Sequence, residues 1–377
     1  MSAPAPAAAA PIVTAAEEKV AAATQLQLTW WRFRKHKLAV ASGIVVVLFY
    51  VMALLGDFLA VTEPHATDAS RSYIPPQAIH FFDDGEFRPH VYALKGKRDM
   101  RTFKLVYAPD SSDKRYLRLF APGYRYEFLG LFETDIHLLG LDRGKPEDAL
   151  FLLGTDQLGR DVWSRLMLAT RTSLTIGLVG VALSLFLGVL LGGISGLYGG
   201  VVDTVIQRVI EILRSIPTIP LWMGLAAALP TTWSVTQVYI AITVIISLIG
   251  WTELARVVRG RFLALREEDF VTAAELAGAS RLRIIFRHMV PSFLSHIIAA
   301  ISLALPAMII SETTLSFLGL GLRPPAISWG VLLQDAQNIQ ALGIAPWLLA
   351  VAVPVVVVIL AFNFLGDGLR DAADPYG

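Results

Sequence analysis

Residues Glu267 to Pro291 read EEDFVTAAELAGASRLRIIFRHMVP, a polar and Arg-rich stretch between two strongly apolar parts of the chain. Asp269 is a suitable N-cap, and Gly278 lies where a glycine would end a helix of about three turns. Ser280 is placed to cap a second helix, and Pro291 falls where the next apolar run begins. The stretch therefore predicts two short helices that form a docking element, with a plain solvated loop as the alternative.

The composition places most of the chain in a lipid bilayer. Of 377 residues, 55% are hydrophobic and 17% are charged, and the mean hydropathy is +0.58, which is too apolar for a water-soluble protein of this length. A net charge of +1 without a large basic patch predicts no nucleic-acid partner. The chain has no cysteine, which excludes disulfides and thiolate metal sites, and we predict no metal and no cofactor.

Apolar runs predict six membrane-spanning helices and hence an all-α membrane protein. The runs are 38–61, 173–197, 204–229, 235–254, 292–318 and 347–365. A basic and aromatic cluster at 30–37 and the arginines around 255–291 place both termini and this loop in the cytoplasm by the positive-inside rule. The first run is longer than a signal-peptide core and lacks a clear cleavage site, which favours an uncleaved span over a signal peptide.

The chain divides into four parts. Residues 1–29 are rich in Ala and Pro and predict a disordered cytoplasmic tail. Residues 30–61 form the anchor and first span, 62–150 form a polar insert, and 151–377 contain the other five spans with the cytoplasmic loop at 255–291. In the insert, aromatic segments at 87–94, 102–107, 116–120 and 124–129 predict strands. The insert exceeds the length of about 60 residues to which the charge rule applies, so an external position is allowed.

Small residues recur at every fourth position of the second span. Such spacing lets neighbouring helices approach closely, which predicts that this helix packs in the centre of the bundle. Steps of four advance about 40° past a full turn, so the row winds around the helix and meets more than one neighbour. Its members are Gly180, Ser184, Gly188, Gly192 and Gly196.

An acid and two prolines inside the spans are candidates for a translocation path. Glu312 and Pro306 lie in the fifth span, and Pro217 lies in the third. Charged residues in membrane segments are functional candidates by default, and prolines kink helices. A paired, purely structural Glu312 is the alternative.

Residues 154–165 read GTDQLGRDVWSR. The stretch lacks the Gly-Lys-Ser/Thr ending of a phosphate loop, so we predict that it does not bind ATP. Leu158, Val162 and Leu166 would share one face of a helix, which predicts an interfacial helix that leads into the second span. An ordinary capped helix is the alternative.

Several of these stretches resemble the permease subunits of ABC importers. Residues 267–291 are similar to the Glu-Ala-Ala loop that forms the coupling helix of that family, although Thr272, His288 and Val290 depart from its pattern. The ending of this loop, residues 154–165 and the C-terminal stretch 366–375 resemble the dipeptide, oligopeptide and nickel branch, in particular the C-type member of its permease pair. The resemblance implies a type I importer permease fold of six transmembrane helices, with a β-rich external insert between the first two.

The resemblance also implies roles for individual residues. A set in the loop would couple to the ATPase: Thr272, Ala273, Ala274, Glu275, Ala277, Gly278, Arg287, His288 and Pro291. A second set would form an external gate or docking site: Asp156, Arg160, Asp161, Pro324 and Trp329.

The implied function is that of a non-catalytic subunit of a peptide importer in the bacterial inner membrane. Its partners would be a second homologous permease subunit, two ABC ATPase subunits and an external solute-binding protein. Nickel, opines, glycosides or antibiotic peptides are alternative solutes. A secondary transporter would usually carry ion-coupling acids and an internal repeat, and a membrane hydrolase would need a His-Glu-x-x-His or Gly-x-Ser-x-Gly element; the sequence contains none of these beyond one mid-span acid.

Overall fold

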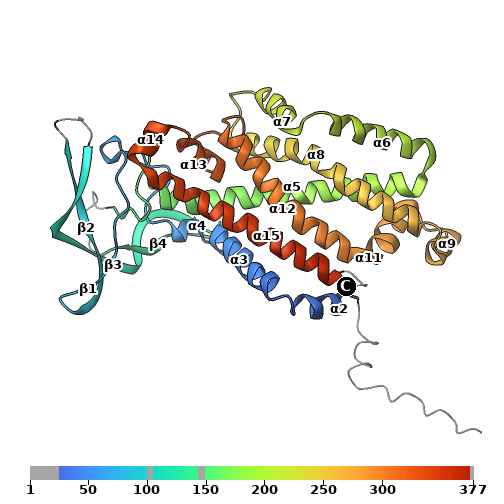
Figure 1. Ribbon diagram of the computed structural model, residues 1–377, viewed down its shortest axis with the longest axis horizontal. Coiled ribbons are helices and arrows are strands. Elements are labelled where there is room, and N and C mark those ends of the chain that lie inside the picture. The colour runs from blue at the N-terminus through green and yellow to red at the C-terminus, as the bar shows by residue number, and fades with distance from the viewer. Residues whose placement is uncertain (1–24, 99, 101–104, 143–148, 374–377) are drawn as a thin grey trace, which may run out of the picture.

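The computed structural model in Figure 1 shows a bundle of long helices with a small sheet at one end. The structure describes residues 25–98, 100, 105–142 and 149–373. The long helices are α3 (Lys37–Leu54), α5 (Val162–Tyr198), α8 (Val235–Leu265), α12 (Leu294–Phe317) and α15 (Ala352–Ala373). The shorter helices are α2 (Gln25–Phe33), α4 (Gly56–Leu59), α6 (Gly200–Ser215), α7 (Thr218–Ala227), α9 (Asp269–Leu276), α10 (Arg281–Arg283), α11 (Val290–Ser292), α13 (Trp329–Asp335) and α14 (Ile339–Ile344). Irregular helical turns occur at η1 (Ala69–Arg71), η2 (Ile284–Met289) and η3 (Pro346–Val351).

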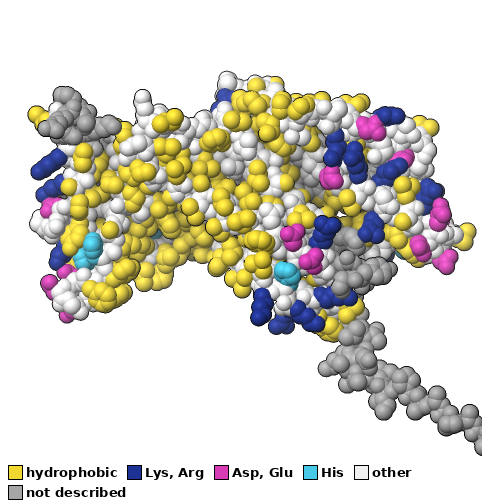
Figure 2. Space-filling model, viewed as in Figure 1, with side chains coloured by type: hydrophobic (Ala, Val, Ile, Leu, Met, Phe, Trp, Pro, Cys, Tyr) yellow, Lys and Arg dark blue, Asp and Glu magenta, His cyan; other side chains and the backbone are white. Residues whose placement is uncertain are grey.

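The surface of the bundle is apolar in its middle and charged at its ends. Figure 2 shows hydrophobic side chains over much of the visible face, with acidic and basic side chains gathered toward the two ends. On α3, for example, Ile44, Val47 and Leu48 are exposed. Such a broad exposed apolar surface suits lipid and not water, and the chain is accordingly a multi-pass membrane protein.

Within the described residues, five helical segments are long and apolar enough to span a membrane, and the predicted third span differs from them. Residues 204–229 form α6 and α7, which meet at an angle of 87°. Ile216 has φ −88° and ψ 129°, because a residue before proline is disfavoured in the helical conformation, and the helix therefore breaks before Pro217. A sixth crossing exists only if this bent pair counts as one span.

Helix α5 is longer than predicted and lies along the centre of the bundle. It runs unbroken from Val162 to Tyr198, so a separate interfacial helix at 154–165 is absent and that prediction is wrong. Asp161 caps the helix through the backbone N–H of Ser164, and Gly199, with φ +63°, ends it. The largest core cluster joins α5 to α3, α8, α12, α13 and α15.

The insert contains a four-stranded antiparallel sheet in the order β1–β2–β3–β4. Its strands are β1 (His80–Asp83), β2 (Glu86–Arg98), β3 (Leu105–Phe128) and β4 (Phe132–Leu141). The predicted β content is confirmed, but 116–120 and 124–128 belong to one long strand, because the Pro-Gly pair at 122–123 lies at an irregularity in the β3–β4 register instead of a turn. Residues 102–104 of another predicted strand lie outside the described residues.

The predicted N-terminal tail lies mostly outside the described residues, which begin at 25. Residues 25–29 belong to α2, so the tail boundary at 29 is wrong. Figure 1 places α2 and the C-terminal end of α15 close together, at the end of the bundle away from the sheet. Residues 374–375 of the C-terminal motif are also outside the described residues.

Candidate functional site

Residues 267–291 fold into α9 and a second, irregular helix at the end of the bundle opposite the sheet (Figure 1). The N-cap of α9 is Glu268, one residue before the cap predicted at Asp269. Gly278 follows α9 with φ +76°, a left-handed conformation that glycine adopts at little cost. Ser280 accepts a hydrogen bond from the backbone N–H of Arg283 at 3.4 Å and so caps α10.

One face of α9 packs against the chain and the other is exposed. Val271 and Ala274 are 1% and 9% exposed and belong to the same core cluster as Ile284 and Ile285. Ala274 therefore faces inward and is not available to a partner. Leu276 is 85% exposed. Leu276 is not among the predicted coupling residues; the exposed members of that set on this segment are Thr272, Ala273, Glu275, Ala277 and Gly278.

Helix α9 and the segment after it are tied to the bundle as one body. Glu275 pairs with Arg281, whose guanidinium lies 5.7 Å from the centre of the Tyr198 ring at the end of α5. Ile285 of η2 is fully buried, and a Cβ added to Gly193 of α5 would lie 3.1 Å from its side chain. The remaining predicted coupling residues are the exposed Arg287 and Pro291 and the half-buried His288.

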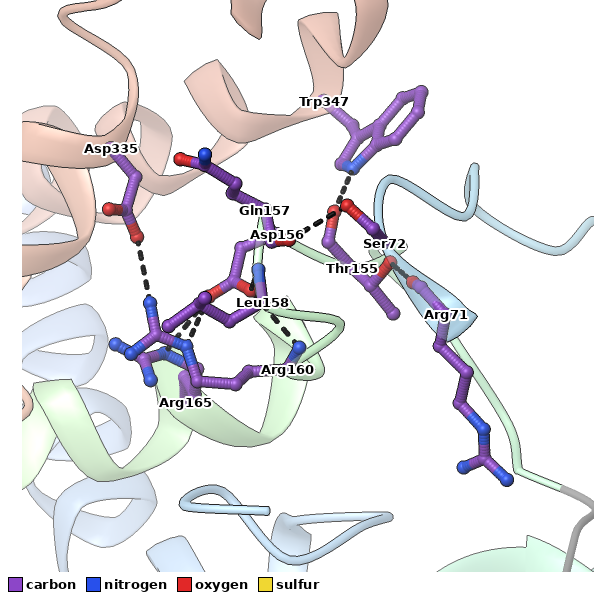
Figure 3. A network of polar contacts seen from close by, with 10 residues as sticks. All are labelled: Arg71, Ser72, Thr155, Asp156, Gln157, Leu158, Arg160, Arg165, Asp335 and Trp347. Carbon is purple, nitrogen blue, oxygen red and sulfur yellow. Dashed lines mark hydrogen bonds and ion pairs between the residues drawn. The ribbon is translucent and has the colours of Figure 1, made fainter. Parts of the chain in front are cut away.

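At the other end of the bundle, residues 154–161 form a tight turn around Asp156 (Figure 3). The Oδ1 atom of Asp156 accepts backbone N–H groups from Leu158 at 2.8 Å and Arg160 at 3.0 Å, and its Oδ2 atom accepts from Arg160 Nε at 2.6 Å. Arg160 Nη2 donates to Asp335 Oδ2 in α13 at 3.4 Å, and Arg165 Nε lies 3.9 Å from Asp156 Oδ2. Burial raises the pKa of Asp335, and the charge of Asp156 raises it further. Two aspartates and two arginines thus join the turn to α5 and α13.

The same turn holds the segment that leads into the insert. Thr155 Oγ1 donates to the carbonyl of Arg71 at 2.6 Å, and Ser72 Oγ donates to the carbonyl of Gln157 at 2.7 Å. The indole N–H of Trp347 donates to the carbonyl of Thr155 at 3.0 Å (Figure 3). The turn at 154–161 therefore holds together segments that are far apart in the sequence, namely those around Arg71 and Trp347.

Asp161 and Ser164 connect α5 to the end of the first span. Asp161 Oδ2 accepts the backbone N–H of Ser164 at 2.8 Å, while Ser164 Oγ accepts the backbone N–H groups of Val61 and Thr62 at 2.9 and 3.0 Å. Burial raises the pKa of Asp161 to about 6, although the hydrogen bonds from Ser164 oppose this shift. Both side chains therefore hold the start of α5 to the segment that follows the first span, and we call this contact the junction.

Four of the five predicted gate or docking residues are buried. Asp156, Arg160, Asp161 and Trp329 are 2%, 8%, 2% and 0% exposed. Pro324 is exposed, in the loop between α12 and α13. The buried residues have no surface to offer a soluble partner in this conformation, and their contacts give them a role in holding the junction together.

Two family models match the chain. The model described as binding-protein-dependent transport system inner membrane component matches residues 188–376, half of the sequence. The chain belongs to this family. A second model, the N-terminal TM domain of oligopeptide transport permease C, matches residues 24–76.

Curated relatives of this family member include peptide permease proteins. The oligopeptide transport system permease protein OppC of Bacillus subtilis is 36% identical over 69% of this chain and 81% of the relative. OppC of Escherichia coli K12 is 42% identical over 59% of this chain and 71% of the relative. The dipeptide transport system permease protein DppC of Lactococcus lactis is 32% identical over 95% of this chain and 93% of the relative.

The small residues of α5 lie against other helices of the same chain. A Cβ at Gly192 would lie 2.5 Å from the carbonyl oxygen of Ala255 in α8, and one at Gly196 would lie 2.9 Å from that of Arg259. Gly188 and Ser184 also face α8, whereas Gly180 faces Met308 of α12. These glycines therefore pack within the chain, against two neighbouring helices. The full set is Gly180, Ser184, Gly188, Gly192 and Gly196.

The predicted path residues are not brought together. Glu312 is 0% exposed; it accepts hydrogen bonds from Ser173 of α5 at 3.0 Å and from Ser316 at 2.8 Å. It therefore links α12 to α5 in this structure, and its role in a translocation path stays a prediction. Pro306 is buried in α12, and Pro217 is exposed at the break between α6 and α7.

One ion pair near the loop was missed from the sequence. Asp203 of α6 accepts hydrogen bonds from Nε and Nη2 of Arg259 in α8, each at 2.5 Å. Asp203 stands just before the predicted third span, and Arg259 is one of the arginines that the positive-inside rule assigns to the cytoplasm. An acid near the start of one span and an arginine at the end of another is a weak signal, because Arg256, Arg261 and Arg266 lie close to Arg259 in the sequence and could equally be the partner.

Proposed function

We propose that the chain is the transmembrane permease subunit of an ATP-driven importer of peptides and forms half of its translocation pathway. Family membership and relatives named as oligopeptide and dipeptide permeases support this function. The proposed partners are a second homologous permease subunit, two ABC ATPase subunits and a solute-binding protein. ATP hydrolysis belongs to the ATPase subunits, so this chain catalyses no reaction.

The observation that carries the proposal is the exposed face of α9. Leu276 is 85% exposed on a helix that packs firmly against the bundle, and Phe270 and Leu282 of the same loop are 40% and 53% exposed. Exposed apolar side chains that gather on one element mark interaction sites, whereas single ones do not. We infer that this face docks on an ATPase subunit. Because Arg281 and Ile285 connect α9 to α5, closure of the ATPases would move α9 and the long helices together.

Replacing Leu276 by Asp is expected to weaken ATPase attachment by about 1 kcal/mol or more, as for loss of an apolar anchor at an interface. The assay is retention of ATPase subunits on the tagged chain, together with uptake of labelled peptide into vesicles. Ile339→Asp is the matched control, since Ile339 is 84% exposed but lies in α14 at the other end of the bundle. Equal ATPase retention by the two variants would contradict the docking role.

We further propose a multi-pass topology in the bacterial plasma membrane, with both termini and α9 in the cytoplasm and the insert outside. The chain has no cysteine, so single introduced cysteines report their side without a background. A thiol reagent that cannot cross the membrane is expected to label Ser111→Cys and Gln337→Cys in intact cells and to spare Ser280→Cys; all three positions are exposed. The reverse pattern of labelling would overturn this topology.

A further inference from the structure

The turn between β3 and β4 carries an apolar group that no residue of the described chain covers. Leu131 is 76% exposed, Phe132 is 58% exposed and Leu129 is 43% exposed. Phe128 pairs with Phe132 across the hairpin, and their rings are 5.5 Å apart. We call residues 128–132 the hairpin tip. An exposed cluster of this kind in water is costly and indicates a binding surface.

The hairpin is amphipathic next to its tip. Glu127 and Glu133 are the neighbouring cross-strand pair, and successive residues of a strand point to opposite faces. The two glutamates therefore project away from the face that carries Phe128 and Phe132, and both are exposed. Like charges placed directly opposite each other repel and are best tolerated in water. One face of the hairpin thus suits water, and the other suits an apolar environment.

The aromatic face meets the chain where the first span ends. Phe58 of α4 lies 6.4 Å from Phe128 and 6.2 Å from Phe120, measured between ring centres. Phe58 follows α3 by only four residues, and the outward side of α3 is lined by the exposed Val47, Val51 and Leu54. The hairpin face is therefore continuous with a surface that faces lipid.

A charged pair at the end of α3 indicates where the bilayer ends. Arg171 Nη1 lies 2.8 Å from Asp57 Oδ2, and Arg171 Nε donates to the carbonyl of Ala53 at 2.9 Å in the last turn of α3. The side chain of Arg171 is 41% exposed, which fits the headgroup region and not the hydrocarbon core. Phe58, next to Asp57, is therefore at headgroup level.

The base of the hairpin is fixed to the same point. The ring of His137 is 2% exposed; its Nδ1 atom lies 2.9 Å from the carbonyl oxygen of Asp57, and its Nε2 atom lies 3.0 Å from that of Tyr124. These contacts join β4 and β3 to α4. They hold the hairpin at a set height relative to the membrane edge.

We propose that the hairpin tip inserts into the headgroup region of the bilayer, so that Leu129, Leu131 and Phe132 anchor the insert on lipid. Apolar side chains on a polar element lie in the interface in this way. The occupant of the surface is the lipid that already surrounds α3, because the two surfaces are continuous. The anchor would fix the sheet beside the bundle and limit its tilting.

The test uses single cysteines labelled with an environment-sensitive fluorophore. Leu131→Cys reports the turn at the tip, which precedes β4, so the alternation of the strand does not fix its direction. Glu133→Cys, inside β4 on the acidic face, is the matched control. The full chain, with the subunits that copurify with it, is placed in nanodiscs that contain either plain lipid or lipid with a nitroxide near the headgroup. Iodide is added separately as a quencher in water.

At position 131 we expect blue-shifted emission, strong quenching by the nitroxide lipid and weak quenching by iodide, and at position 133 the reverse. Quenching by iodide but not by nitroxide at position 131 would place the tip in water and overturn the proposal. Protection from both quenchers would show that protein covers the tip, which overturns it equally. Phe132→Cys, labelled in the same way, repeats the measurement should Leu131→Cys fail to fold.

Discussion

Replacing Asp156 by Asn is expected to lower the free energy of unfolding of the chain by about 3 kcal/mol. This is the lower end of the usual cost of removing one partner of a buried ion pair. Asp156 is 2% exposed and accepts Arg160 Nε at 2.6 Å. Asparagine keeps an oxygen for the backbone N–H groups of the turn but presents an NH₂ group to Arg160, so two donors would face each other. Arg165, buried 3.9 Å away, would lose its nearest negative charge.

The measurement is thermal unfolding of the purified chain in detergent, followed by tryptophan fluorescence. Asp113→Asn is the control, because Asp113 pairs with Arg115 at 3.4 Å with half of its side chain exposed, and such pairs contribute less than about 1 kcal/mol. In a double-mutant cycle, Arg160→Gln is expected to cost less in the Asp156→Asn background than alone. Strictly additive effects would show that the two side chains do not act together.

The local features of the loop at 267–291 could be predicted from the sequence because they depend on neighbours in the chain. Ser280 caps a helix through an N–H three residues away, and Gly278 adopts the left-handed backbone that ends α9. The inward direction of Ala274 could not be predicted, because it depends on Ile284 and Ile285 folding back beneath α9. The sequence spacing alone left either face of α9 free to point outward.

Residues 154–165 show a different limit. Their apolar spacing fits a helix, but Asp156 binds the backbone of its own turn, and this competes with helix formation. The turn is then fixed by Asp335 and Trp347, whose contacts lie 175 and 192 positions along the chain from Arg160 and Thr155. The break before Pro217 was, by contrast, predictable from the restriction that proline places on the residue before it, but apolar residues continue on both sides of the proline in 204–229 and concealed it.

The glycines of α5 allow a test of the packing that places this helix in the centre of the bundle. Gly192→Leu is expected to destabilise the chain by about 3 kcal/mol, at the upper end of the usual cost of overpacking. A Cβ at this position would lie 2.5 Å from the carbonyl oxygen and 2.9 Å from the Cα of Ala255. Since the obstacle is backbone, no side-chain rotation relieves it, and α5 and α8 have to move apart.

Gly260→Leu in α8 is the matched control. Gly260 is also helical, it is exposed, and an added Cβ would meet no atom within 4 Å. Leucine has the higher helix propensity, so this variant is expected to gain up to about 0.8 kcal/mol. The assay is the midpoint of thermal unfolding for the chain purified alone, since the contact lies within one chain and its loss requires no partner. A loss of stability that appears only in the assembled complex would instead place Gly192 at an interface between subunits and contradict the packing described here.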